Sequence, residues 1–177
     1  MENLWVMMIV GTIFIGYTSY TTYNSVKLFI TFKKKLGEFQ IAHKNAELYY
    51  DGRWMPIVTG ILSVFSLAMA FFSYRYNTTD QTFYVVMAYV CIAIIFAGLA
   101  FETYVRKRAY LIEEGMFYVD QIYRYRIMLK FEQKGTVIKK VRITMGNGDK
   151  IEVSRKFGLF LEEKTHEHKK YKKDRKK

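Results

Sequence analysis

Hydrophobic and charged residues are segregated along this chain rather than mixed. Almost no charge occurs before Lys27, between Trp54 and Tyr74, or between Phe83 and Phe101, whereas the last third carries most of the Lys and Arg. A charge at the centre of a bilayer costs about 3 kcal/mol or more, so membrane-spanning segments exclude it. The pattern predicts an integral membrane protein with a basic region outside the bilayer.

Three apolar stretches are long enough to be spanning helices, which need about 20 residues. We expect them at 4–23, with a helical extension to residue 32, at 54–74 and at 83–104. The short connection at 75–82 makes the second and third an antiparallel hairpin. A cleaved signal peptide is a poorer interpretation of the first stretch, because no basic region precedes it and no small-residue cleavage site follows.

The first stretch becomes polar towards its end, with Thr18, Ser19, Thr21 and Thr22. Hydroxyls at these positions can bond back to helix carbonyls, so they need not end the helix. Small residues at four-residue spacing, Thr59 with Ser63 and Ala93 with Ala97, predict close contacts between helices. We interpret them as packing within the three-helix unit, with docking of a partner membrane protein as the alternative.

The distribution of Lys and Arg predicts the orientation. The interval 24–53 carries Lys27, Lys33, Lys34, Lys35, Lys44 and Arg53, and the third span is followed by Arg106, Lys107 and Arg108. No basic residue precedes Lys27, and the short turn has only Arg75. Because basic segments stay in the cytoplasm, we expect a multi-pass protein of the cell membrane with its N-terminus outside and its C-terminal domain cytoplasmic.

The cytoplasmic interval 33–53 has a helical pattern. Its apolar residues recur at Leu36, Phe39, Ala42, Ala46 and Tyr49, with basic residues on both sides. This predicts a short amphipathic helix over 36–50, lying on the membrane or under the tail domain.

Residues 106–163 change to the two-residue period of strands. Turn signals at Glu113-Glu114-Gly115, at Lys134-Gly135 and at 146–149 separate runs rich in aromatic and β-branched residues. We expect about five antiparallel strands and one helix. One face of the sheet packs against the helix, and the other face is available for lipid or a partner.

The strands also have predicted inward faces. We place Ile127, Leu129 and Phe131 on one face, and group Val137 with Val141 and Ile143. Ile151 and Val153 point inward after the Asn147-Gly148 hairpin turn. Phe157, Phe160 and Leu161 have helical spacing and predict a helix that covers the sheet.

Residues 164–177 are basic and contain few apolar side chains, so we expect a disordered tail. Attraction to anionic lipid of the inner leaflet is its expected role, worth about 1 kcal/mol per basic residue, with RNA contact as the alternative. The residues that we expect to contact lipid headgroups are Lys33, Lys34, Lys35, Arg106, Lys107, Arg108, Lys169, Lys170, Lys172 and Lys173.

The net charge of +12 would suggest nucleic acid for a soluble protein, but in a membrane protein it is a topology signal. The single cysteine, Cys91, excludes an internal disulfide and a cysteine-based zinc site, and we interpret it as a packing residue. His43, His166 and His168 are expected on the surface rather than as ligands. We therefore predict no metal site and no cofactor.

The segment Tyr110–Ile127 carries a resemblance. Gly115 followed by Met116, Phe117 and Tyr118, then Ile122, Tyr125 and Ile127, resembles the bacterial YobD-like family of three-span inner-membrane proteins. The family has no settled activity. The tail also resembles the PH-like modules of small bacterial membrane proteins, some of which act in bacteriocin immunity. The resemblance implies three spans followed by a small PH-like cytoplasmic domain.

Four functions compete. We favour a non-enzymatic scaffold or accessory subunit whose cytoplasmic domain binds a partner protein or anionic lipid. An immunity protein against a membrane-active toxin and an oligomeric channel or transporter subunit are alternatives. An enzyme is disfavoured because no catalytic motif appears. Its candidate acids, Glu113, Glu114, Asp120, Glu132 and Glu152, fall in a turn or on separate polar faces.

Overall fold

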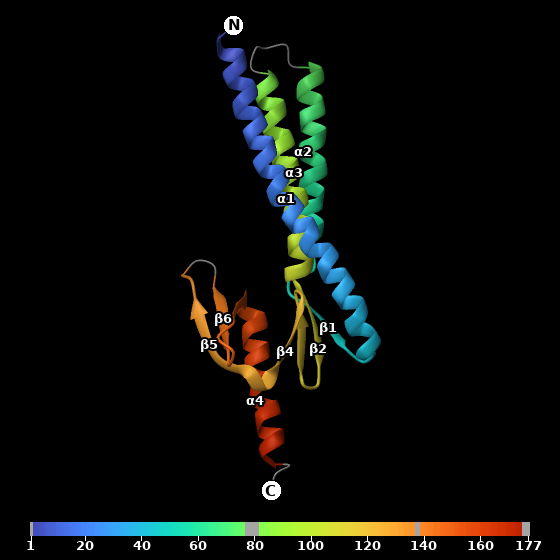
Figure 1. The fold of residues 1–177 in the computed structure, drawn as a ribbon, viewed down its shortest axis with the longest axis vertical. Coiled ribbons are helices and arrows are strands. Elements are labelled where there is room, and N and C mark those ends of the chain that lie inside the picture. Colours follow the sequence, from blue (N-terminus) through green and yellow to red (C-terminus); the bar gives the residue numbers. More distant parts are fainter. Residues whose placement is uncertain (1, 77–81, 137–138, 175–177) are drawn as a thin grey trace. The chain divides into compact units, whose positions relative to one another are not determined.

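The computed structural model describes residues 2–76, 82–136 and 139–174. They form two compact units. The helical unit contains residues up to 34 together with 52–107, and the strand unit contains residues 35–51 together with those from 108 onward. Each unit is therefore assembled from two separate parts of the chain (Figure 1).

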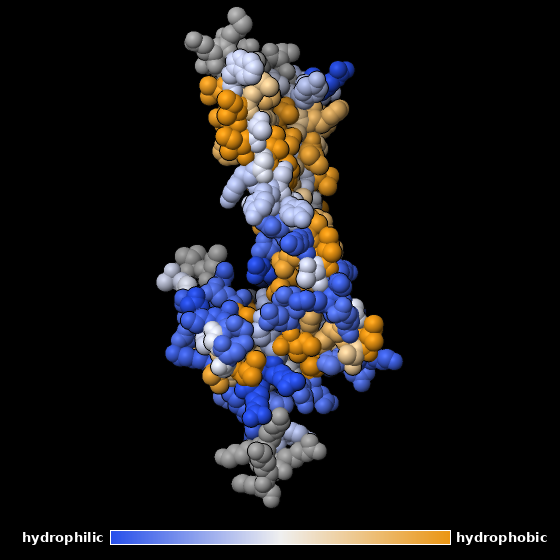
Figure 2. All heavy atoms as spheres, viewed as in Figure 1, coloured by the Kyte–Doolittle hydropathy of each residue, from blue (hydrophilic) through white to orange (hydrophobic). Residues whose placement is uncertain are grey.

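The helical unit contains α2 (Met55–Tyr76), α3 (Thr82–Arg106) and most of α1 (Glu2–Ala42). Helices α2 and α3 are long and apolar enough to cross a membrane, and only 11% and 17% of their most apolar windows are buried inside the protein. The core helix of a soluble protein would be mostly buried. Orange, hydrophobic residues dominate the surface of these helices (Figure 2).

Helix α1 packs against α3 with the same chain direction. Thr22 Oγ1 donates a hydrogen bond to the Ile94 carbonyl at 2.8 Å, and the Phe29 and Phe101 rings lie 5.2 Å apart. Both residue numbers rise together along the contact, so the two helices are parallel. A Cβ on Gly98 would come within 3.2 Å of Thr22 Cα, which shows how closely the backbones approach.

Helices α2 and α3 pack through Ser63 and Ala93, two of the small residues expected from the sequence. Ser63 Oγ donates to the Ala93 carbonyl at 2.8 Å, and Ala93 is buried. Thr59 bonds back to Met55 O in its own helix at 2.9 Å. Cys91 is buried on α3, in agreement with a packing role.

Helix α1 does not stop at its polar stretch or at its lysines. Thr18 and Thr21 bond back to carbonyls of α1, Phe14 O at 2.9 Å and Thr18 O at 2.8 Å, as expected from the sequence. The helix then continues through Lys33-Lys34-Lys35 to Ala42. The expected end of this helix at residue 32 is therefore wrong, because exposed lysines are compatible with a helix.

The four-stranded sheet of the strand unit contains β1 (Glu47–Tyr50), β2 (Arg108–Ile112), β3 (Gly115–Tyr118) and β4 (Gln121–Arg124) in that order. All neighbours are antiparallel. Strand β1 precedes the α2–α3 hairpin and β2 follows it, with Tyr50 opposite Arg108. The hairpin is thus an insertion between two paired strands.

The predicted amphipathic helix over 36–50 is correct only as far as Ala42. Leu36 and Phe39 are buried, and Phe39 stacks on Phe117 of β3 with 4.9 Å between ring centres. This end of α1 therefore covers part of the sheet face that the sequence predicts to be available for lipid or a partner, whereas Ile122 on the same face stays 50% exposed. Residues 47–50 form a strand instead, because β2 pairs with their backbone.

The second sheet contains β5 (Met128–Lys134), β6 (Lys140–Met145) and β7 (Lys150–Ser154). The predicted hairpin joins β6 to β7, with Gly148 at φ +87°, where glycine is favoured. Val141, Ile143 and Val153 are buried as predicted, whereas Val137 lies outside the described residues. Asn77-Thr78-Thr79, a possible glycosylation sequence, also lies outside them.

The prediction that Ile127, Leu129 and Phe131 share one inward face is wrong for Leu129. Leu129 is 64% exposed, whereas its neighbour Met128 is fully buried. A short 3-10 turn at Tyr125–Ile127 and a register shift between Met128 and Lys130 reverse the alternation. With β1 and β4 added, the described residues hold seven strands rather than about five.

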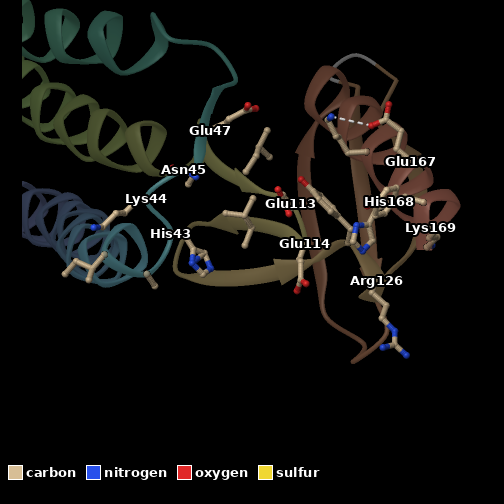
Figure 3. Close-up of a pocket in the computed structure, with 18 residues that line it drawn as sticks. His43, Lys44, Asn45, Glu47, Glu113, Glu114, Arg126, Glu167, His168 and Lys169 are labelled. Carbon is tan, nitrogen blue, oxygen red and sulfur yellow. Dashed lines mark ion pairs between the residues drawn. The ribbon is translucent and has the colours of Figure 1, made fainter. Parts of the chain in front are cut away.

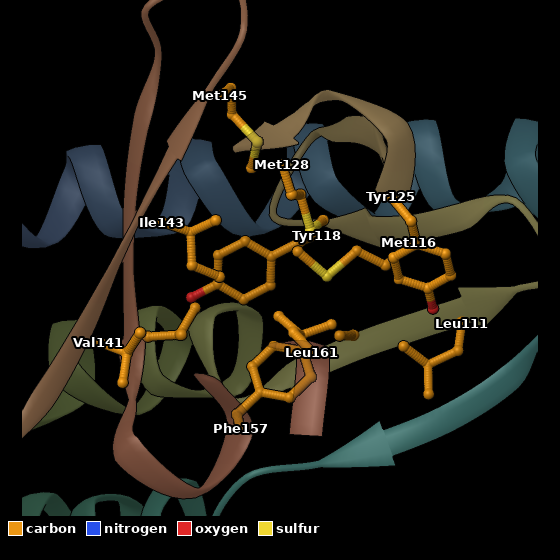
Figure 4. Packing of buried hydrophobic residues seen from close by; sticks show 12 residues of the cluster. Leu111, Met116, Tyr118, Tyr125, Met128, Val141, Ile143, Met145, Phe157 and Leu161 are labelled. Atoms are coloured by element: carbon orange, nitrogen blue, oxygen red, sulfur yellow. The ribbon is translucent and has the colours of Figure 1, made fainter. Parts of the chain in front are cut away.

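Helix α4 (Arg155–Asp174) closes the core of the strand unit. Phe157 and Leu161 are buried, as predicted, among residues of both sheets (Figure 4). The expected disordered tail from residue 164 is wrong as far as Asp174, because the helix continues. Thr165 extends the four-residue spacing of Phe157 and Leu161 and is 1% exposed, and Lys169 Nζ donates to the Met128 carbonyl at 3.2 Å.

Candidate functional site

The strand unit contains a hollow of about 1870 Å³, which we call the charged hollow. Its walls are residues 41–47, the turn between β2 and β3, the 3-10 turn at 125–127, and α4 from Lys164 to Tyr171. Figure 3 shows these segments facing one another around an open space. Leu111 and Tyr125 contribute to its lining.

Charges of both signs surround the hollow. Glu47, Glu113 and Glu114 come from the sheet side, and Lys164, Glu167 and Lys169 come from α4 (Figure 3). Lys164 and Glu167 form an exposed ion pair at 3.3 Å. A mixed rim of this kind suits a segment that carries alternating charges, such as a peptide, better than a uniformly anionic surface.

Tyr125 is the buried polar residue of the hollow. It is 3% exposed, and its N–H donates to the Glu114 carbonyl at 2.9 Å. Burial, and then the negative charge of Glu47, raise the pKa of Tyr125 to about 12. The phenol therefore stays protonated near neutral pH, where it has no basic form to offer a reaction.

The carboxylates considered for an enzyme are dispersed. Glu113 and Glu114 occupy the exposed turn between β2 and β3, as expected. Asp120 pairs with Lys35 at 3.2 Å. These groups belong to different segments and do not converge on one point of the hollow with a shared partner.

Two more carboxylates lie on the outer face of the second sheet. Glu132 pairs with Lys130 and Glu152 with Arg142, each at 2.6 Å. The hydrogen bond from each cation lowers the pKa of its carboxyl partner. A carboxylate with a lowered pKa is a poor general acid at neutral pH.

The histidines do not assemble a metal site within the described part of the chain, where no group of three or more His, Cys, Asp or Glu is placed to hold an ion. His43 packs on the Phe39 ring at 4.7 Å, and His168 lies 5.9 Å from the Tyr125 ring. His166 is exposed.

The basic residues expected at lipid headgroups are divided between the units. In the helical unit, Lys33 lies over the Tyr104 ring at 5.5 Å, and Arg106 pairs with Glu102 at 2.7 Å. Lys34 is exposed, and Lys107 is half-buried.

The strand unit holds the other six. Lys35 is paired with Asp120, Arg108 lies over the Tyr50 ring at 5.0 Å, and Lys169 bonds to Met128 O. Lys170 is exposed. Lys172 and Lys173 belong to α4, but their side chains lie outside the described ones.

Sequence patterns gave no direct indication of the charged hollow. Its walls depend on the turn after α1, where the sequence predicts a helix, and on the continuation of α4 beyond Lys164, where it predicts a disordered tail. The recurrence of Thr165 four residues after Leu161 was the one available signal for the second of these walls.

Comparisons of this chain with protein-family models, with curated proteins and with solved structures give no match.

Proposed function

We propose that this protein is a non-enzymatic accessory subunit of the cell membrane. Three spanning helices hold a PH-like cytoplasmic domain, and this domain binds a segment of a partner protein in the charged hollow.

The pairing of β1 with β2 is the main support for this membrane arrangement. Tyr50 lies opposite Arg108, so the chain leaves the strand unit before α2 and returns to the adjacent strand after α3. Both ends of the hairpin are therefore on one side of any membrane that it crosses. The two helices must cross in opposite directions, which agrees with basic residues on both flanks of the hairpin.

The direction of α1 supports a third crossing. Helix α1 is parallel to α3 through the contacts Thr22–Ile94 and Phe29–Phe101. If α3 enters the cytoplasm at its C-terminal end, α1 does so too, and its last turns belong to the strand unit. The N-terminus then lies outside, which is the orientation that the Lys and Arg distribution favours.

The order of the strands supports a PH-like domain. Four strands of one sheet are followed by three of a second sheet and then by a C-terminal helix. The membrane hairpin would occupy the connection between the first and second strands. The YobD-like resemblance agrees with this layout and stays a prediction.

The charged hollow favours a protein segment over a lipid headgroup as its occupant. The lining holds four carboxylates and four basic side chains, so it lacks the excess of positive charge that attracts anionic lipid; these residues are Glu47, Glu113, Glu114 and Glu167, and Lys44, Arg126, Lys164 and Lys169. Three of the basic residues expected at lipid, Lys35, Arg108 and Lys169, already contact groups within the strand unit.

The test is chemical crosslinking in native membranes, followed by purification of a tagged full-length chain. We expect one stoichiometric protein partner, lost when Glu113 and Glu114 are both changed to Lys. Glu162→Lys with Glu163→Lys is the matched control, because it makes the same charge change on α4 outside the hollow. Recovery of anionic lipid without a protein, or equal partner recovery from both double variants, would contradict the proposal.

A further inference from the structure

The outward side of α1 carries polar side chains in a region where α2 is apolar. Tyr17 and Tyr20 are 68% and 65% exposed, and Asn24 and Lys27 are exposed as well. Their spacing of three and four residues places all four on one side of the helix. We call these residues the polar stripe. It lies opposite the side through which Thr22 and Phe29 contact α3.

The contact with α3 gives the depth of the stripe. Thr22 meets Ile94, which is the middle residue of α3 (Thr82–Arg106). With a rise of about 1.5 Å per residue, Tyr20 and Asn24 lie ~3 Å from that level, and Tyr17 and Lys27 lie ~7.5 Å from it. The hydrocarbon core extends ~15 Å to either side of its midplane. If the helices cross a bilayer, the whole stripe is inside the hydrocarbon.

Helix α2 shows what a lipid-facing surface of this protein looks like. At similar depth its exposed side chains are Ile61, Val64 and Phe65, at 62%, 68% and 60%. Figure 2 shows the middle of α1 as pale and blue among the orange residues of the helical unit. Within the described residues, the side chains of Asn24 and Lys27 have no hydrogen bond or ion pair. Polar and charged groups left facing lipid are costly, which indicates that something covers them.

Lys27 decides between the possible covers. In a symmetric parallel dimer, the Lys27 side chains of two copies would meet at the same depth and repel one another. A helix from another protein can instead place a carboxylate there and remove the penalty of both charges. Tyr20 and Asn24 supply hydrogen-bonding groups at the centre of the same face.

We propose that the polar stripe is the docking face for a transmembrane helix of a different membrane protein, which places an Asp or Glu at the level of Lys27. The inference rests on the proposed crossing of the membrane by α1. It adds a second, intramembrane contact to the cytoplasmic one in the charged hollow.

The experiment uses the full-length chain in its native membranes, with the photocrosslinker benzoyl-phenylalanine in place of Tyr20. Phe65 on α2 is the matched control position, because it is aromatic, 60% exposed and two residues from Ser63, which contacts Ala93 beside Ile94. We expect Tyr20 to crosslink to one membrane protein and Phe65 to crosslink only to lipid. Mass spectrometry then identifies the protein and the crosslinked segment.

The charge at Lys27 supplies the second readout. We expect Lys27→Glu to reduce the Tyr20 crosslink about tenfold or more, and Lys27→Arg to preserve it. Changing the partner's membrane-embedded carboxylate to Lys should restore the crosslink in the Lys27→Glu chain. These three results together support the inference, whereas capture of a protein that is insensitive to Lys27 contradicts it.

Crosslinks from Tyr20 to lipid alone, or to a second copy of the chain, would also overturn the inference. Alkaline extraction of the same membranes separates this failure from failure of the proposed function. If the chain stays in the membrane and keeps the partner that depends on the charged hollow, only the docking role of the polar stripe is disproved. If alkali releases the chain, the proposal that its helices span the membrane is itself disproved.

Discussion

Tyr50 and Arg108 stand directly opposite one another in the β1–β2 pair, and the Arg108 guanidinium lies 5.0 Å from the centre of the Tyr50 ring. The complete α2–α3 hairpin separates these residues in the sequence. The strand unit is therefore a folded domain with two helices inserted between its first two strands. Strand β1 can pair with β2 only after the intervening α2–α3 hairpin has been synthesised. The four-stranded sheet therefore depends on a contact between residues far apart in the sequence, which slows its formation.

Strand β1 should contribute substantially to the stability of the strand unit. Tyr49 of β1 stacks on two rings of α4, with 4.6 Å between the centres of the Tyr49 and Phe157 rings and 5.0 Å between those of Tyr49 and Phe160. We expect Tyr49→Ala to lower the free energy of unfolding by about 2–3 kcal/mol, through lost burial and two lost ring contacts. Urea unfolding of the purified full-length chain in detergent, followed by hydrogen exchange in β1 and β2, measures it.

Leu48 is the matched control for Tyr49. It belongs to the same strand but is 39% exposed, so Leu48→Ala should cost less than about 1 kcal/mol. Equal losses for the two variants would show that β1 is not held by α4.

The parallel contact of α1 with α3 depends on Gly98. A Cβ at this position would meet Thr22 Oγ1 at 2.8 Å and its Cα at 3.2 Å, whereas a Cβ on Gly60 would meet nothing within 4 Å. We expect Gly98→Leu to weaken the helix contact by about 1–3 kcal/mol and Gly60→Leu to leave it unchanged.

Crosslinking of cysteines at Phe29 and Phe101 by a short reagent that joins two thiols reports this contact, because the two native rings lie 5.2 Å apart. With Cys91 changed to Ala, the yield should fall about tenfold or more in the Gly98→Leu chain. A normal yield in that variant would mean that α1 does not pack on α3 at Thr22.

Stability should fall in alkali through Tyr125. Its pKa is raised to about 12 by burial and by Glu47, against 10.0 for an ordinary tyrosine. The folded protein therefore holds a proton that the unfolded chain releases, and unfolding is favoured as the pH rises from 10 to 12. This contribution to the free energy of unfolding is fully present below pH 10. About 2 kcal/mol of it is lost as the pH rises from 10 to 12.

Unfolding at pH 9 and pH 11.5, compared between the native sequence and Tyr125→Phe, isolates this effect. The variant should lose less stability between the two pH values than the native sequence does. Identical losses would place the alkaline sensitivity on other groups, of which Tyr123 is one with a pKa raised by burial.

The second sheet contains a repulsive pair that can be relieved. Lys134 and Lys140 are directly opposite on β5 and β6, and both are exposed. Like charges in this position are destabilising, so Lys140→Glu should raise the stability by about 0.5–1 kcal/mol. Lys150→Glu is the control, because Lys150 is opposite Thr144 and gains no such contact. A larger gain from Lys150→Glu in thermal unfolding would contradict the cross-strand explanation.

The helices and the local hairpins could be predicted from the sequence because their signals are local. Apolar length marked α2 and α3, and the Asn147-Gly148 turn marked the β6–β7 hairpin. The burial of Phe157 and Leu161 followed from helical spacing.

The missed elements depend on partners far along the chain. The four residues of β1 are a strand because β2 pairs with them beyond the hairpin, and their apolar spacing happened to continue that of Phe39. Leu129 points outward because of a register shift that no residue type requires. The charged hollow was hidden for the same reason, since Glu47, Glu114 and Lys169 meet only after the whole strand unit has formed.

The most direct test of the inserted membrane hairpin is labelling of single cysteines, in a Cys91→Ala background, with a membrane-impermeant thiol reagent. One cysteine replaces Lys44, before β1, one replaces Lys134, after β2, and a third lies in an N-terminal tag. Intact cells and inverted membrane vesicles are compared. We expect the cysteines at positions 44 and 134 to be labelled only in inverted vesicles and the tag only in intact cells. Labelling of the cysteines at positions 44 and 134 from opposite sides would contradict the insertion of the hairpin between β1 and β2.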